Sequence, residues 1–295
     1  MSSGKTVTQE LSVGEVISKT FELYRRNFVK YLIVYLVVEA IIGVVTAIAY
    51  HTFVLPTLPP NSTRQQVLDW LPGFLGTLFS LVAVIGVVDL VFGPIAAGGT
   101  IKMASEEIEG RPVELGASVR FAASKLVWMW ALGLIVGIIV GLGFIALVIP
   151  GIILAIMFCL TLPALLLENV GVIGSLGRSR ELVSHRWLKT FAVFLIWVVI
   201  IAIISIIVGL IASPFGWASN IVSSLLSAFY LPLIPIALTL FYYSNLARIT
   251  LPPTGPMPWG QTAVAPPGMK FCPNCGTQLE SSVTFCSKCG ARQPL

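Results

Sequence analysis

The chain has 295 residues, of which 11% are charged and 56% are hydrophobic, and its mean hydropathy is +0.93. An ordinary soluble domain carries about 25% charged residues, so this chain has too few polar side chains to cover a soluble fold of its length. Disorder is excluded as well, because disordered chains are poor in apolar residues. The net charge of +5 does not indicate a nucleic-acid partner, because the basic residues stand beside hydrophobic segments. The composition therefore indicates an integral membrane protein whose basic residues face anionic lipid headgroups.

Six segments have the length and polarity of transmembrane helices, which need about 20 mostly apolar residues to cross a bilayer. They are residues 29–53, 74–99, 127–148, 149–167, 188–212 and 221–246. Their apolar runs do not alternate in polarity, which excludes the strands of a membrane barrel. The sequence therefore predicts an all-α polytopic membrane protein with six transmembrane helices.

Lysine and arginine are distributed very unevenly around these six segments. Seventeen of the 18 fall on one side of the predicted membrane, and only Arg64 falls on the other. Basic residues are retained on the cytoplasmic side of a membrane. We therefore expect a multi-pass protein of the cell membrane with both termini in the cytoplasm.

Three amphipathic segments, at about 11–28, 113–126 and 171–187, each combine a glycine, a helical stripe of apolar residues and several basic residues. Helices of this kind lie in the membrane interface, with the apolar face toward the lipid chains. The membrane domain, residues 1–250, would then contain three units, each an interfacial helix followed by a helical hairpin. The alternative is that the ends of the spans simply collect Lys, Arg and Trp.

The clearest motif lies at the C-terminus, where Cys272 with Cys275 and Cys286 with Cys289 form two Cys-x-x-Cys pairs separated by ten residues. Zinc favours four thiolates in a tetrahedron, so residues 270–295 are predicted to form a zinc ribbon around one structural Zn²⁺. All four ligands come from the protein, which leaves no coordination position for catalysis. Because so short a segment cannot build its own core, the metal would supply its folding energy.

The segment 251–269 joins the predicted membrane domain to the ribbon. It has six prolines and no charged residue, which predicts an extended and semi-rigid linker. Reduced thiolates are typical of the cytoplasm, in agreement with the distribution of basic residues. We therefore expect the ribbon to lie in the cytoplasm, and we expect its surface to dock a protein partner there.

Two carboxylates, Glu39 and Asp89, lie inside the first two predicted spans, each roughly 15 Å deep at 1.5 Å per residue. A charged carboxylate near the centre of a membrane costs at least ~2.5–3.5 kcal/mol on insertion scales, and no Lys or Arg lies within a span to pair with it. One interpretation is a proton or cation site, which would make the protein a small-solute or ion transporter. The other is a hydrogen-bonded contact that joins two helices.

Smaller features accompany these motifs. Gly133, Gly137 and Gly141 repeat at four-residue steps and favour close helix approach, either within the chain or in an oligomer. Gly93-Pro94 predicts a kink near Asp89. Glu168 with Asn169 is expected to cap the helix that follows.

The segment IPGIILAIMFCLTLPALLLENVGVIGSLGRSREL, with the opening GEVISKTFELYRRNF, resembles the membrane domain of the glycerophosphoryl diester phosphodiesterase superfamily. The resemblance covers about residues 11–245 and implies a stand-alone membrane protein. The catalytic barrel of that superfamily is not part of this sequence, so we predict that the protein is not an enzyme. The predicted function is scaffolding, regulation or bilayer organisation.

Overall fold

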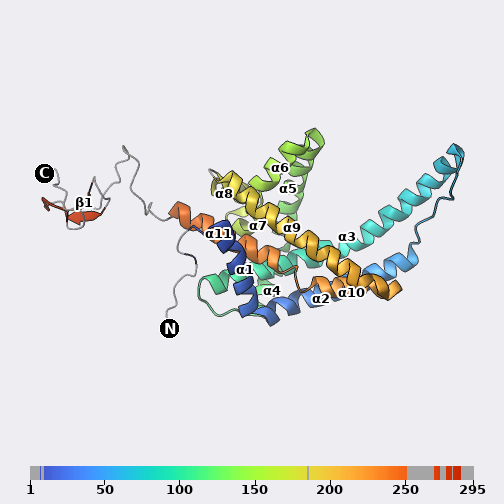
Figure 1. Ribbon diagram of the computed structural model, residues 1–295, viewed down its shortest axis with the longest axis horizontal. Coiled ribbons are helices and arrows are strands. Elements are labelled where there is room, and N and C mark those ends of the chain that lie inside the picture. The colour runs from blue at the N-terminus through green and yellow to red at the C-terminus, as the bar shows by residue number, and fades with distance from the viewer. Residues whose placement is uncertain are drawn as a thin grey trace. The chain divides into compact units, whose positions relative to one another are not determined.

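The computed structural model describes Val7 and residues 10–184, 186–250, 269–272, 277–280 and 282–286. They belong to two compact units, Met1–Leu246 and Ala247–Leu295. The helices in chain order are α1 (Val13–Arg26), α2 (Phe28–Thr52), α3 (Arg64–Ile108), α4 (Leu115–Ser124), α5 (Leu126–Ala146), α6 (Val148–Met157), α7 (Thr161–Glu168), α8 (Gly171–Val183), α9 (Trp187–Ala212), η1 (Ser213–Ala218), α10 (Ser219–Ser227) and α11 (Leu233–Thr250). Figure 1 shows this helical unit.

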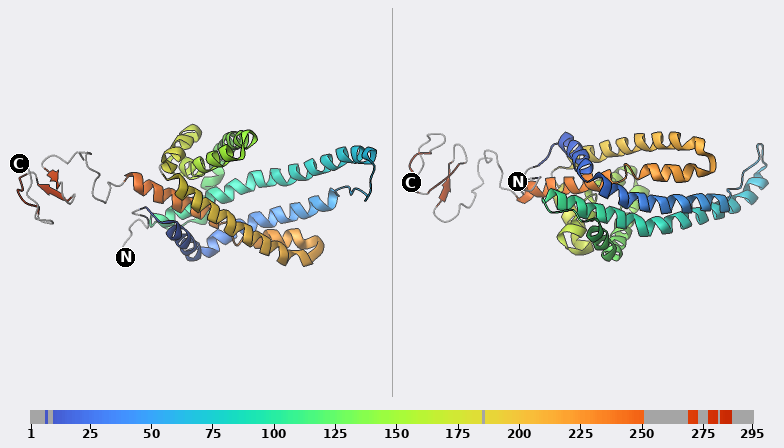
Figure 2. Two further views of the ribbon diagram at one scale, coloured as in Figure 1. Left: turned by 45° about the horizontal axis from the view of Figure 1, so that its top comes forward. Right: turned by 90° about the horizontal axis from the view of Figure 1, so that it is seen from below.

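Helices α2 and α3 form a long pair, and α10 packs against α2 from another side (Figures 1 and 2). Helix α3 has 45 residues, far more than the 26 predicted for the second span, and Pro94 does not interrupt it. A side-chain cap explains where it begins, because the Thr63 hydroxyl accepts from the Gln66 N–H while the Gln66 side chain accepts from the Thr63 N–H.

The fourth and sixth predicted spans are each divided into two helices. Residues 158–160 separate α6 from α7, and residues 228–232 separate α10 from α11. A proline ring clashes with the carbonyl four residues before it and lacks the N–H that would bond to that carbonyl. Pro163 and Pro232 place this conflict at Cys159 and Ala228, inside the two breaks. Neither break was predicted from the sequence.

Among the described residues, five stretches are long and apolar enough to cross a membrane: α2, α3, α5, Val148–Glu168 and Trp187–Ser227. Leu233–Ile249 is apolar as well but shorter. The stretch Trp187–Ser227 contains both α9 and α10, which are separated by a turn at Gly216 and pack against each other. The structure thus offers five candidate spans by length and composition, and it does not confirm the predicted number of six.

A separate short helix precedes each of the helices α2, α5 and α9, close to the three amphipathic ranges predicted from the sequence. Helix α1 packs against α2 and α9, α4 against α3 and α5, and α8 against α7, α5 and α6. In α1 the residues Val16, Thr20 and Leu23 are buried within the protein. Part of the apolar stripe of each of these short helices therefore packs against other helices of the protein and does not contact lipid.

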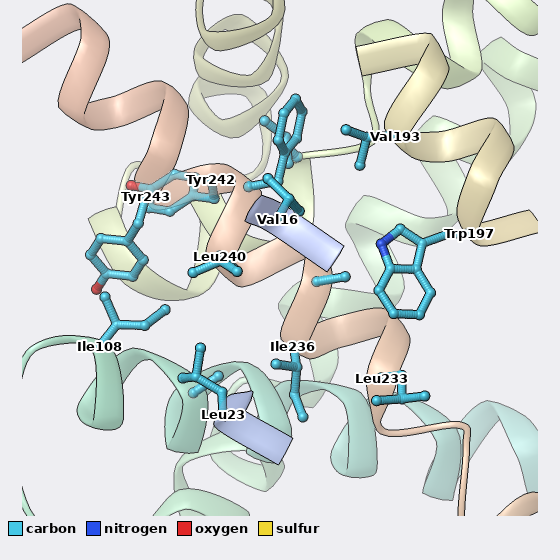
Figure 3. Packing of buried hydrophobic residues seen from close by; sticks show 14 of the residues in the cluster. Val16, Leu23, Ile108, Val193, Trp197, Leu233, Ile236, Leu240, Tyr242 and Tyr243 are labelled. Atoms are coloured by element: carbon cyan, nitrogen blue, oxygen red, sulfur yellow. The ribbon is translucent and has the colours of Figure 1, made fainter. Parts of the chain in front are cut away.

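Helix α11 carries much of the hydrophobic core. Its residues Ile236 and Leu240 have no exposed surface and lie in one cluster with Val16 and Leu23 of α1 and Trp197 of α9 (Figure 3). In the second unit, strands β1 (Met269–Phe271) and β2 (Gln278–Glu280) form an antiparallel hairpin in which Lys270 lies opposite Leu279.

Candidate functional sites

The hairpin of the second unit positions two of the four predicted zinc ligands. Cys272 directly follows β1, and its N–H donates to the Thr277 carbonyl at 2.9 Å, which closes the turn toward β2. Cys272 and Cys286 are 2% and 3% exposed and lie in one cluster with Leu279. The fold thus brings one thiol from each Cys-x-x-Cys pair to the same place.

The other two predicted ligands, Cys275 and Cys289, lie outside the described residues. For this reason no group of three or more metal-ligating side chains occurs within the part of the chain that the structure describes. The donor chemistry still fits zinc, since Cys272 and Cys286 are buried thiols whose cluster contains, among the described residues, only Leu279 besides them.

The comparison with protein families bears on this same segment. Residues 271–293 match the zinc-ribbon domain. The C-terminus is thus a zinc ribbon, which implies a zinc-binding site. No curated protein and no solved structure matches the chain.

The two carboxylates predicted inside the membrane occupy neighbouring helices. Glu39 on α2 is 9% exposed, whereas Asp89 on α3 is exposed at the apolar surface. They are close enough to interact electrostatically, yet no hydrogen bond joins them, and neither forms an ion pair with a described residue. The Asp89 carboxylate lies along its own helix, since a Cβ added at Gly93 would stand 3.0 Å from Asp89 Oδ1. The two acids are therefore neighbours that do not bridge α2 and α3 directly.

A polar network that the sequence analysis missed surrounds Glu168 at the end of α7. The Arg178 Nε donates to both oxygens of Glu168 at 2.8 and 2.9 Å, and the Tyr242 hydroxyl donates to Glu168 Oε1 at 2.5 Å. Partial burial alone would lower the pKa of Arg178, but its hydrogen bonds to Glu168 and Glu181 raise it. Glu168 is therefore a hub that joins α7, α8 and α11, and the prediction that it caps a helix is wrong. Asn169 ends α7 in a left-handed conformation.

The adjacent tyrosine makes a similar contact with the end of α3. The Tyr243 hydroxyl donates to the Glu109 carboxylate and lies 3.0 Å from the Ser105 hydroxyl. The signal for this network was in the sequence, because two consecutive tyrosines interrupt the apolar run of the last predicted span. Spacing alone identifies no partner for a pair of tyrosines, so the contacts themselves could not be predicted.

Proposed function

We propose that this chain is an integral membrane protein that presents its zinc ribbon to a cytoplasmic protein partner, in a scaffolding, regulatory or bilayer-organising role. The observation that carries the proposal is the ribbon itself. Its predicted ligands are all protein thiolates, which leaves no position for a substrate and makes the metal structural. A structural metal holds a small surface in one shape, and a surface of that kind serves recognition.

The proposal includes six crossings, with α10 and α11 together forming the last one across the break at residues 228–232. The location of 17 of the 18 basic residues on one side supports cytoplasmic termini. Helices α1, α4 and α8 would lie at the cytoplasmic interface and contact anionic headgroups with their exposed faces. The family comparison matches only the ribbon, so the resemblance of residues 11–245 to the phosphodiesterase membrane domain and a role without catalysis stay predictions.

The test is a pulldown of the tagged full chain from native membranes in mild detergent, with bound proteins identified by mass spectrometry. Wild type is compared with a Cys272→Ser and Cys286→Ser double variant, which loses the ribbon while the helices remain. Cys159→Ala, a thiol removed within the helical unit, is the matched control. A partner retained by wild type and the control but lost from the double variant supports docking. A partner bound equally by all three would show that the ribbon is not the docking module.

The second candidate function is transport of a small solute or ion, and the pair Glu39 and Asp89 favours it. Glu39 is only 9% exposed in an apolar helix, and no described cation pairs with it. An ionisable side chain placed in this way within a membrane is typical of a functional site. The test is proton flux into proteoliposomes under a potassium diffusion potential, followed with an enclosed pH-sensitive dye. Transport requires flux that Glu39→Gln and Asp89→Asn abolish and that Glu181→Gln, outside the spans, leaves unchanged. Absence of flux from wild type would argue against proton transport.

A further inference from the structure

An apolar cavity of about 880 Å³ lies between α5, α9 and α11, with the end of α6 closing it. This volume is within the range of ligand sites, which is roughly 300–1,000 Å³. No charged residue lines the cavity. Its lining residues Phe194 and Val198 are 42% and 48% exposed, so the cavity opens at the apolar surface of the helical unit.

The three glycines of α5 create this space. Gly133, Gly137 and Gly141 all line the cavity, and a Cβ added at any of them would meet no atom within 4 Å. Gly143 and Gly151 differ completely, because a Cβ there would lie 2.7 Å from Leu154 and 2.4 Å from Phe144. The repeated glycines therefore do not pack against another helix of this chain. They leave room where other residues would fill it.

The length of the cavity and the charged residues beyond one of its ends indicate its occupant. Along α9 it extends from Thr190 to Ala202, which is about 18 Å at 1.5 Å per residue. One leaflet of a bilayer contributes about 15 Å of hydrocarbon, so the cavity matches the chains of a single leaflet. At the Thr190 end, Arg186 and Lys189 bind the carboxylate of Glu10 at 3.2 and 2.5 Å, and Glu15 also interacts electrostatically with Lys189. The Arg186 side chain remains 48% exposed and its guanidinium carries five N–H donors, so it can also bind the phosphate of a lipid headgroup.

We propose that this cavity is a binding site for one membrane lipid with an anionic headgroup, whose hydrocarbon chain lies against the glycines of α5. The headgroup lies near Arg186 and Lys189, on the side that the proposed topology places in the cytoplasm. The site requires that the chain spans a membrane, but it is independent of docking by the ribbon. A lipid held between α5 and α9 joins the α5–α6 hairpin to the rest of the helical unit.

The test uses the full chain reconstituted in nanodiscs of phosphatidylcholine and phosphatidylglycerol, transferred to detergent, and weighed by native mass spectrometry. Wild type is expected to retain one phosphatidylglycerol. Leucine side chains at Gly137 and Gly141 would fill the cavity, so the Gly137→Leu and Gly141→Leu double variant is expected to lose that lipid. Gly209→Leu is the matched control, because Gly209 lies on α9 outside the cavity, has open space around it and should leave the bound lipid in place. Equal retention in all three proteins, or no retention in wild type, overturns the proposal.

A second measurement decides the question if the double variant does not fold. Phosphatidylglycerol with a photoreactive group on its chain is crosslinked to wild type, and the labelled peptides are mapped. Label concentrated on Gly133–Phe144 and Thr190–Ala202 supports the site. Label spread evenly over all exposed apolar helix faces overturns it. Disulfide-linked dimers of a Gly137→Cys variant would also overturn it, because they would show that a second copy of the chain occupies this surface.

Discussion

Removal of zinc should unfold the hairpin of the C-terminal unit. Fixing the six residues of β1 and β2 costs roughly 1–2 kcal/mol each, or about 6–12 kcal/mol in total. The only buried side chain of β2 is Leu279, whose burial returns about 1.5–3 kcal/mol. The burial of Leu279 is smaller than the conformational free-energy cost of fixing the two strands, so another interaction must supply the difference. Structural zinc supplies about 10–16 kcal/mol in comparable small domains, which is enough to fold the hairpin.

The assay is hydrogen exchange of the full chain, read by mass spectrometry on peptides that cover residues 269–286, with zinc content measured in parallel. Wild type should contain one zinc per chain and protect these amides, and both should disappear with a strong chelator or with Cys272→Ser. The control Cys159→Ala should retain both. Protection that persists in a zinc-free protein would refute the reasoning, because it would mean that the hairpin is stable without metal.

Three further predictions concern the helical unit. Ser12→Ala should weaken the start of α1 by about 1 kcal/mol, seen as faster hydrogen exchange of the α1 amides. Hydrogen bonds from Ser12 lower the pKa of Glu15. The Glu15 half of this capping box is therefore formed at neutral pH and is lost as the pH falls through that lowered pKa. Tyr242→Phe removes a hydrogen bond to the Glu168 carboxylate and should cost about 1.5–3 kcal/mol in thermal unfolding in detergent. Gly151→Ala would force a Cβ onto the Phe144 ring and should cost about 1–3 kcal/mol, whereas Gly137→Ala should cost little.

The sequence was sufficient for the features that depend on composition and spacing. Long apolar runs predicted helices that are long and apolar enough to cross a membrane, and the pairs of cysteines predicted the ribbon. These signals are local, because a single segment contains the whole pattern. Cys272 and Cys286 lie where that pattern requires, within one cluster.

Features that depend on contacts between distant segments were not predicted. The hub at Glu168 needs Arg178 from α8 and Tyr242 from α11, which is 74 residues away in the chain. The space beside Gly137 was equally hidden, since the same glycine spacing serves tight packing and an open cavity. Only the arrangement of the neighbouring helices distinguishes the two.

The breaks in the fourth and sixth predicted spans show a further role for the amphipathic helices. At the first break, the Ser179 hydroxyl of α8 donates to the Met157 carbonyl at 2.7 Å and accepts from the Leu160 N–H at 3.2 Å. At the second, the Tyr24 hydroxyl of α1 donates to the Phe229 carbonyl at 2.7 Å, and burial raises the pKa of Tyr24 to about 12, so this donor keeps its proton. Backbone groups freed by a break within lipid must find partners inside the protein. Helices α1 and α8 provide those partners.

This role yields a prediction that separates packing from membrane contact. Ser179→Ala leaves Met157 and Leu160 without their side-chain partner in a buried site, and should destabilise the helical unit by about 1–3 kcal/mol. Ser175→Ala is the matched control, because Ser175 is equally buried on α8 and its hydroxyl donates to the Val172 carbonyl of its own helix, with no bond to another described helix. Thermal unfolding in detergent measures both variants. If α8 served only to contact lipid, the two substitutions would have the same small effect, and the explanation of the breaks would be wrong.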